Sequence, residues 1–131
     1  MSRLVREIEQ SMSGLSEVEG DEVTACFRFR EEFIGFQGHF PDRPVLPAVC
    51  KIQAAIAVLE AWSKREVKLG EIVSAKFLSP VTCGEEIVVR CSVTMEDDGC
   101  GVVRAAVARD AESVAKFKLR VTFENGRRGG S

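Results

Sequence analysis

The second half of the chain repeats one pattern, in which apolar and polar residues alternate over short runs. A period of two predicts strands that bury one face. Turn signals separate the runs, among them Asp98-Gly99, a favoured hairpin turn. We therefore expect four antiparallel strands that follow one another as a meander. They cover Ile72 to Leu78, Glu86 to Thr94, Val102 to Ala108 and Val114 to Phe123.

The pattern before residue 48 predicts a helix, a strand and a long loop. Apolar residues recur at helical spacing from Leu4 to Leu15, so residues 3 to 13 are expected to form an amphipathic helix that ends near Gly14. Alternation from Val23 to Phe29 predicts a strand. Residues 31 to 47 have no period and are dense in glycine and proline, which indicates a structured loop.

Residues 48 to 63 are apolar on nearly every side of a helix, with only Lys51, Gln53 and Glu60 interrupting. A helix that is apolar all round is buried all round. The element order therefore predicts an α+β fold, in which an antiparallel sheet wraps around one central buried helix. We expect one domain over residues 1–123 and a flexible tail over 124–131. The open sheet edge favours pairing with a second copy.

Composition narrows the class of protein. The 131 residues carry a net charge of −2, which argues against a nucleic-acid partner, and no apolar run is long enough for a membrane span. The N-terminal residues lack the apolar core of a signal peptide, so we expect a cytoplasmic protein. The five cysteines are scattered and there is one histidine, so we expect free thiols and no metal site.

That histidine, His39, is the first candidate for chemistry. Histidine exchanges protons near neutral pH. His39 lies between Gly38 and Phe40, in a proline-rich stretch that runs directly into the apolar helix. A backbone constrained in this way holds the imidazole in one place.

The stretch Phe36-Gln37-Gly38-His39-Phe40-Pro41-Asp42-Arg43-Pro44-Val45-Leu46-Pro47-Ala48-Val49 resembles the hot-dog-fold (3R)-hydroxyacyl-acyl-carrier-protein dehydratases, the FabZ/FabA-like family. A second likeness runs from Ala75 to Glu85, and the resemblance as a whole covers Glu17 to Phe123. It implies a dimer whose active site joins the histidine of one subunit to an acid on the central helix of the other. It also implies a β-hydroxyacyl thioester substrate, carried on the phosphopantetheine of acyl carrier protein or on coenzyme A, and no other cofactor.

The same resemblance assigns roles to individual residues. His39 is the base at the α-carbon, and backbone N–H groups near Ala48 and Val49 polarise the thioester carbonyl. Gly38 is a further substrate-binding residue, as are Phe36 and Phe40, whose rings either line the acyl channel or belong to the core. Together with Gln53, these residues make up the predicted site.

Two positions depart from the family pattern. The catalytic acid of the family falls at Gln53, and an amide has no proton to give near pH 7. The family has glycine where this chain has Ala48, and the added methyl group narrows the approach of a ligand to the backbone. Gln53 either orients substrate or water, or bonds to the partner chain. Cys50 is expected to pack, and Glu60 substitutes for the acid only in an unusually deep pocket.

Three functions follow. The first is a dehydratase or hydratase of acyl thioesters in fatty-acid or polyketide- and polyene-type synthesis, with His39 and Gln53 as its site. The second is a non-catalytic protein that binds acyl thioesters or carrier protein, or the inactive half of a heterodimer. The third is a hot-dog thioesterase. The assembly is expected to be a homodimer, a higher oligomer of dimers or a heterodimer.

Overall fold

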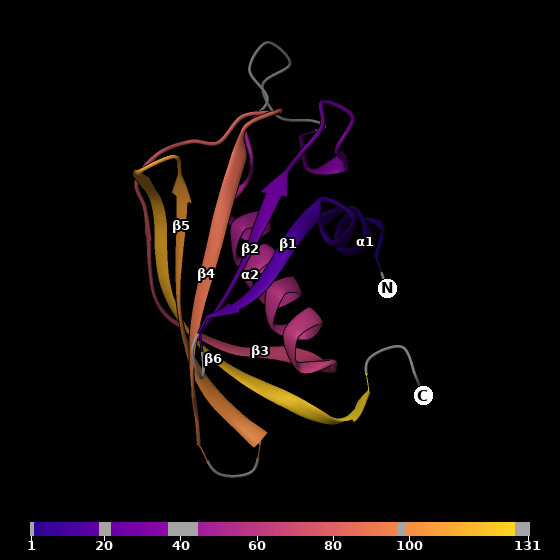
Figure 1. Cartoon of the computed structure of the whole chain (residues 1–131), viewed down its shortest axis with the longest axis vertical. Coiled ribbons are helices and arrows are strands. Elements are labelled where there is room, and N and C mark those ends of the chain that lie inside the picture. Colours follow the sequence, from indigo (N-terminus) through magenta and orange to yellow (C-terminus); the bar gives the residue numbers. More distant parts are fainter. Residues whose placement is uncertain (1, 19–21, 37–44, 97–98, 128–131) are drawn as a thin grey trace.

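The structure is a computed structural model and describes residues 2–18, 22–36, 45–96 and 99–127. Its elements form one six-stranded antiparallel sheet with two α-helices, as Figure 1 shows. Within these ranges neither helix is long and apolar enough to cross a bilayer. The elements are α1 (Arg3–Gln10), β1 (Met12–Val18), β2 (Glu22–Arg28), the 3₁₀ helix η1 (Ile34–Phe36), α2 (Ala48–Ser63), β3 (Arg65–Phe77), β4 (Glu86–Met95), β5 (Cys100–Arg109) and β6 (Glu112–Arg127).

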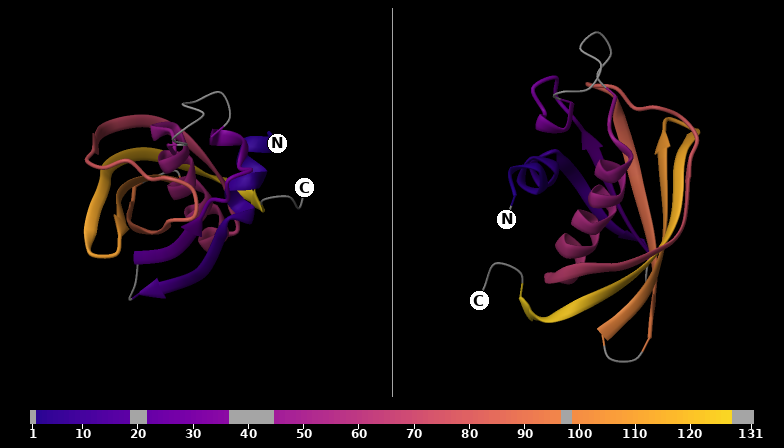
Figure 2. Two further views of the ribbon diagram at one scale, coloured as in Figure 1. Left: turned by 90° about the horizontal axis from the view of Figure 1, so that it is seen from above. Right: turned by 180° about the vertical axis from the view of Figure 1, so that it is seen from behind.

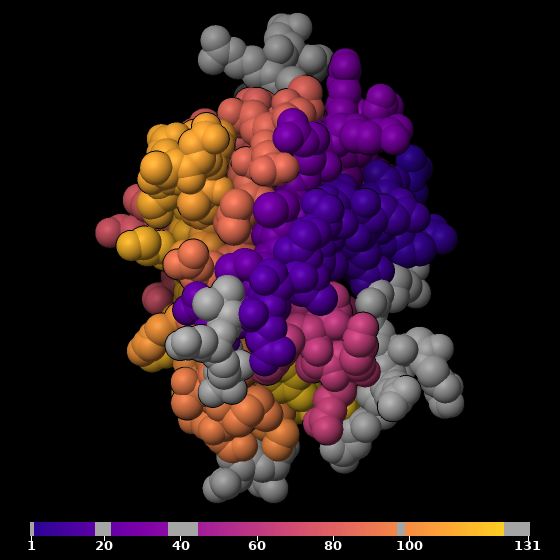
Figure 3. Space-filling model, viewed as in Figure 1, coloured from indigo at the N-terminus to yellow at the C-terminus, as the bar shows by residue number. Residues whose placement is uncertain are grey.

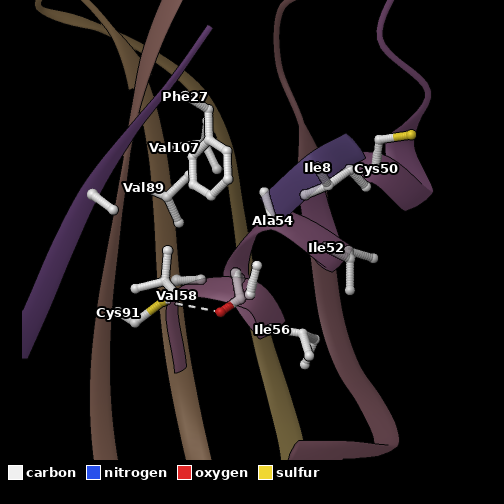
Figure 4. Packing of buried hydrophobic residues seen from close by; sticks show 14 of the residues in the cluster. Ile8, Phe27, Cys50, Ile52, Ala54, Ile56, Val58, Val89, Cys91 and Val107 are labelled. Atoms are coloured by element: carbon white, nitrogen blue, oxygen red, sulfur yellow. Dashed lines mark hydrogen bonds between the residues drawn. The ribbon is translucent and has the colours of Figure 1, made fainter. Parts of the chain in front are cut away.

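The sheet curls around α2, as expected from a helix that is apolar on every side (Figures 1 and 2). Ten of its sixteen residues are buried. Figure 4 shows Phe27, Val89 and Val107 of three neighbouring strands directed at one side of the helix, which carries Ala54 and Val58. Burying each large apolar side chain contributes about 1.5–3 kcal/mol, so α2 is the centre of the core. The expected α+β architecture is confirmed.

The first helix is shorter than expected, and the strand that follows it was not anticipated. Helix α1 ends at Gln10, and Met12–Val18 forms β1, which pairs with β2. Met12 and Leu15 matched helical spacing by coincidence. The chain leaves the helix at Ser11, and Gly14 then takes φ +63° at a bulge in the strand. That left-handed conformation suits glycine and is incompatible with a continuing helix.

The expected four-strand meander is wrong for its first member. The strand order is β1-β2-β4-β5-β6-β3, so β4, β5 and β6 form a meander, whereas β3 pairs with β6 at the far edge. Eight residues separate β3 from β4, too many for a tight hairpin. Within this connection Val81 is buried and accepts a hydrogen bond from Leu46 at 2.7 Å. The connection therefore runs from the edge strand β3 past β6 and β5 to β4, an inner strand of the sheet.

The last strand continues further than the alternating pattern suggested. Strand β6 runs to Arg127, which pairs with Arg65, so it extends into the segment for which we expected a tail. The turn at Asp110 and Ala111 is confirmed, and Asp110 takes φ 54° there. Residue 98 of the other expected turn lies outside the described residues, and Gly99 has φ +76°.

Candidate active site

The described residues on either side of the segment that contains His39 belong to the core. Residues 37–44 lie outside the described part of the chain, so the structure tests nothing about Gly38, His39 or Phe40. On one side Phe36 is buried, with its ring edge-on to Phe33 at 5.4 Å between centroids. On the other side Leu46 is buried and bonded to Val81. Phe36 is thus a core residue in this structure.

Helix α2 begins directly after this segment, with an open N-terminus. Pro47 is its N-cap and supplies no side-chain hydrogen bond. The N–H groups of Ala48 and Val49 have no intrahelical partner, because the first turn of a helix has none to offer. Among the described residues no side chain caps them, and both residues are exposed. Such an end attracts a partial negative charge, such as a polarised carbonyl oxygen.

The same face of α2 continues to Gln53. Residues four apart on a helix lie one above the other, so Gln53 is below Val49. Val49 is 61% exposed and Gln53 is partly exposed, whereas the residues between them are buried. The structure therefore brings Val49 and Gln53 to one open face, and Ala48 is exposed in the turn where that face begins. The polar group on that face is an amide, which can hold a hydroxyl or a water but cannot donate a proton to it as an acid does.

Lys51 is a buried charge that the sequence pattern did not reveal as such. Its side chain is only 4% exposed, and its ammonium nitrogen lies 5.6 Å from the centre of the Phe77 ring. Burial lowers the pKa of Lys51, and the nearby Arg109 guanidinium lowers it further. The only signal in the sequence was a charge within an apolar helix. Lys51 lies two residues before Gln53 and therefore points to the other side of α2. It does not replace the missing acid at the position of Gln53.

Cys50 has the properties of a packing residue rather than a nucleophile. It is buried beside Ile8 of α1 (Figure 4). Burial raises the pKa of its thiol to about 11, so the thiolate is scarce at neutral pH. Across the described residues all five cysteines are free, as expected.

Glu60, at the opposite end of α2, has a structural hydrogen bond. It is buried, and its carboxylate accepts a hydrogen bond from the Val67 N–H at 3.0 Å. Burial raises the pKa of Glu60, and this hydrogen bond partly opposes the shift. Seven residues along a helix correspond to about 10 Å, so Glu60 lies far from Gln53 and fixes the turn into β3.

Strand β3 adds an unusual apolar edge beside this helix. It is the last strand of the sheet, and all but one of its residues are exposed. Large apolar side chains along it and just beyond it are 41–48% exposed: Leu69, Ile72, Val73, Phe77 and Leu78. A long, exposed, apolar edge is a template for pairing with another chain. Since Phe77 contacts Lys51, this edge lies next to the first turns of α2.

Known proteins resemble this chain in sequence and in fold. Residues 15–118 match the ApeI-like family, described as ApeI dehydratase. The chain is 37% identical over 118 residues to the 3-hydroxyacyl-(acyl-carrier-protein) dehydratase FabZ of Lactococcus lactis, covering 82% of this chain and 78% of that one. It is 34% identical over 126 residues to FabZ of Clostridium botulinum strain Okra, covering 88% and 81%.

The solved structures agree on the architecture. The dehydratase heterocomplex ApeI:P from Xenorhabdus doucetiae superposes with a TM-score of 0.69 at 17% identity, covering 85% of this chain and 96% of that one. This likeness supports the hot-dog fold that the motif implied. The extent of the family match, together with relatives above 30% identity, identifies the chain as a member of the ApeI-like dehydratase family.

Proposed function

We propose that this protein is a dehydratase of 3-hydroxyacyl thioesters. The observation that carries the proposal is the open first turn of α2, where the N–H groups of Ala48 and Val49 have no side-chain cap and Val49 lies one turn above Gln53. The dehydratases FabZ among its relatives supply the substrate class. We place the reaction in the cytoplasm, in fatty-acid or polyene-type synthesis.

In the proposed reaction His39 performs both proton transfers. Its neutral imidazole takes the proton from the α-carbon, and the electron pair of that C–H bond forms the α,β double bond. The C–O bond at the β-carbon breaks, and the leaving hydroxyl takes a proton from the imidazolium. The products are an enoyl thioester and water, with His39 neutral again. No step requires a metal or a cofactor.

Gln53 and the helix end have supporting roles in this mechanism. The Gln53 amide hydrogen-bonds to the β-hydroxyl and holds it next to the imidazolium. The N–H groups of Ala48 and Val49 face the thioester oxygen, which becomes more negative as the α-proton leaves. Because general acid–base catalysis is typically worth about 10²–10⁴-fold, an amide in place of an acid predicts a slow enzyme.

We further propose that the site is completed by a second copy, joined along β3. The exposed apolar edge supports this assembly, because pairing two such edges removes Ile72 and its neighbours from water. In the resulting dimer His39 of one copy faces Gln53 of the other. The third function, a thioesterase, is less well supported, because it needs a carboxylate where the open face of α2 has Gln53.

The test is turnover of a small substrate. Purified protein is incubated with 3-hydroxybutyryl-N-acetylcysteamine, and in reverse with the crotonyl thioester, while enoyl absorbance is followed. We expect turnover in both directions. His39→Ala should lower the rate at least about 10²-fold, and Gln53→Glu should raise it by up to about 10²-fold. Unchanged turnover by His39→Ala would disprove the assignment of the base.

The second candidate is the inactive half of a heterodimer, which Gln53 favours. The structural likeness to ApeI:P, which is described as a dehydratase heterocomplex, supports considering it. In that case the partner supplies the acid and uses His39. A silent wild type combined with an active Gln53→Glu variant would favour this candidate over the dehydratase.

A further inference from the structure

Arg109, the last residue of β5, holds the connection between β3 and β4 (residues 78–85) at two points. Its Nη1 donates a hydrogen bond to the Pro80 carbonyl oxygen at 2.6 Å and another to the Glu85 carboxylate at 3.2 Å. Its Nη2 donates to Glu112, the first residue of β6, at 2.6 Å. The Arg109 side chain is 18% exposed, so water competes little with these charge-assisted hydrogen bonds.

The carboxylate of Glu85 continues this network into the backbone of the connection. The oxygen that accepts from Arg109 also accepts hydrogen bonds from the Thr82 N–H at 2.8 Å and from the Thr82 hydroxyl at 3.1 Å. The backbone hydrogen bond from Thr82 is the main reason that the pKa of Glu85 is lowered, and the nearby Arg109 charge contributes. Glu85 is therefore ionised at neutral pH, and one of its oxygens joins Arg109 to Thr82.

The same part of the connection holds the residues that lead into α2. The Val81 carbonyl accepts the hydrogen bond from the Leu46 N–H at 2.7 Å, and Thr82 forms an antiparallel bridge with Val45. Val45 and Leu46 directly precede Pro47, the N-cap of α2. The contacts of the arginine therefore continue through the connection to the first turn of the helix.

We propose that Arg109 positions the first turn of α2 for catalysis, by holding the connection with which Val45 and Leu46 pair. This inference rests on the proposed function, and Arg109 acts through the connection rather than on the substrate. The N–H groups of that turn stabilise the thioester oxygen only within about 2.7–3.1 Å of it. A displacement of about 1 Å in such a site can cost about 10²-fold in rate. Pro47 provides no side-chain hydrogen bond that would fix the turn in another way.

A role in stability alone is the alternative, and Arg120 provides the matched control. Arg120 also forms two ion pairs, with Glu96 at 2.9 Å and with Glu71 at 3.6 Å. Glu96 follows β4 whereas Glu85 precedes it, so the two arginines bind at opposite ends of that strand. Replacing either arginine by glutamine removes two ion pairs, but only Arg109→Gln releases the connection.

The first experiment measures the start of α2 without catalysis. Amide hydrogen exchange followed by NMR gives the rate at the Leu46 N–H in wild type, Arg109→Gln and Arg120→Gln, below the melting range of all three. Arg109→Gln should raise this rate about tenfold or more, because the Val81 carbonyl that protects the amide is no longer held in place. Arg120→Gln, which changes a half-exposed side chain, should leave the rate within about twofold. Equal rates in the two variants would overturn the proposal.

The second experiment measures the effect of Arg109 on the reaction. For turnover of 3-hydroxybutyryl-N-acetylcysteamine, Arg109→Gln should lower kcat about tenfold and leave KM within about twofold, because the N–H groups act on the transition state more than on the bound substrate. Arg120→Gln should retain both constants. A wild-type kcat in Arg109→Gln, or an equal loss in both variants, would overturn the positioning role. If the wild type does not turn over the thioester, the dehydratase proposal fails, whereas the exchange rate of Leu46 still tests whether Arg109 holds the start of α2.

Discussion

The two edges of the sheet are built in opposite ways. Strand β1 is short and carries a glycine bulge, serines and a glutamate, all features that discourage pairing with another chain. In Figure 3 the indigo segment of α1 and β1 lies across the middle of the displayed face. Strand β3 has thirteen residues and an exposed apolar row. The comparison indicates that β1 discourages pairing with another chain, whereas β3, the edge beside α2, supports the pairing with a second copy that we propose.

The largest effect should come from placing a charge on each edge in turn. Ile72→Lys in β3 and Leu15→Lys in β1 change side chains that are 46% and 43% exposed. The β3 variant should become monomeric and lose turnover. The new ammonium would be buried in the proposed interface between two β3 strands without a carboxylate to pair with. The β1 variant should keep both properties, since exposed substitutions usually cost less than about 0.5 kcal/mol. Light scattering after size-exclusion chromatography, together with the thioester assay, measures both.

A second β3 variant, Leu69→Lys, guards against a local folding defect at Ile72, and thermal melts identify any unfolded variant. Equal masses for folded β3 and β1 variants would mean that the two edges are equivalent, which contradicts the comparison.

A smaller effect, on stability, is expected at the start of β3, where Glu60 accepts a hydrogen bond from the Val67 N–H. Because burial raises the pKa of Glu60 in the fold, the folded state binds its proton more tightly than the unfolded state does. The stability of the wild type relative to Glu60→Gln should therefore fall as pH rises above the usual value of 4.5. Urea unfolding of both proteins at pH 4.5 and 7.5 measures this difference. A difference that stays constant with pH would show that Glu60 is ionised equally easily in both states.

The smallest effect is expected at the other end of β3, where Lys51 lies over Phe77. Burial lowers the pKa of Lys51, so the folded state releases this proton before the unfolded state does. The stability of the wild type relative to Lys51→Met should rise as pH approaches the usual lysine value of 10.5. Thermal unfolding at pH 7 and pH 9.5 provides the comparison. If the stability of the wild type relative to Lys51→Met is lower at pH 9.5 than at pH 7, this result would contradict the burial of the ammonium.

The sequence predicted those parts of the fold that depend on local pattern. Helix α2 has the expected bounds, because an apolar run of this length after Pro47 has one stable arrangement, buried within a sheet. The partner of β3 depends instead on which strands meet across the fold, and alternation along one strand carries no information about its neighbour. For the same reason the pattern predicted the strands of the meander and misplaced β3.

The candidate site divides in the same way. The motif led to Val49 and Gln53, and helix geometry places them on one face. Lys51 was not predicted to be buried, since a lysine in a sequence is read as exposed and only the packing of Phe77 against α2 covers it.

The central claim is that one site uses His39 of one copy and Gln53 of the other, across the β3 seam. Mixing inactive His39→Ala with inactive Gln53→Ala protein tests it, because a mixed dimer then contains one site with both native side chains. The account predicts that the mixture recovers part of the wild-type turnover of 3-hydroxybutyryl-N-acetylcysteamine after subunit exchange. A mixture that exchanges subunits and remains as inactive as its two components would contradict it.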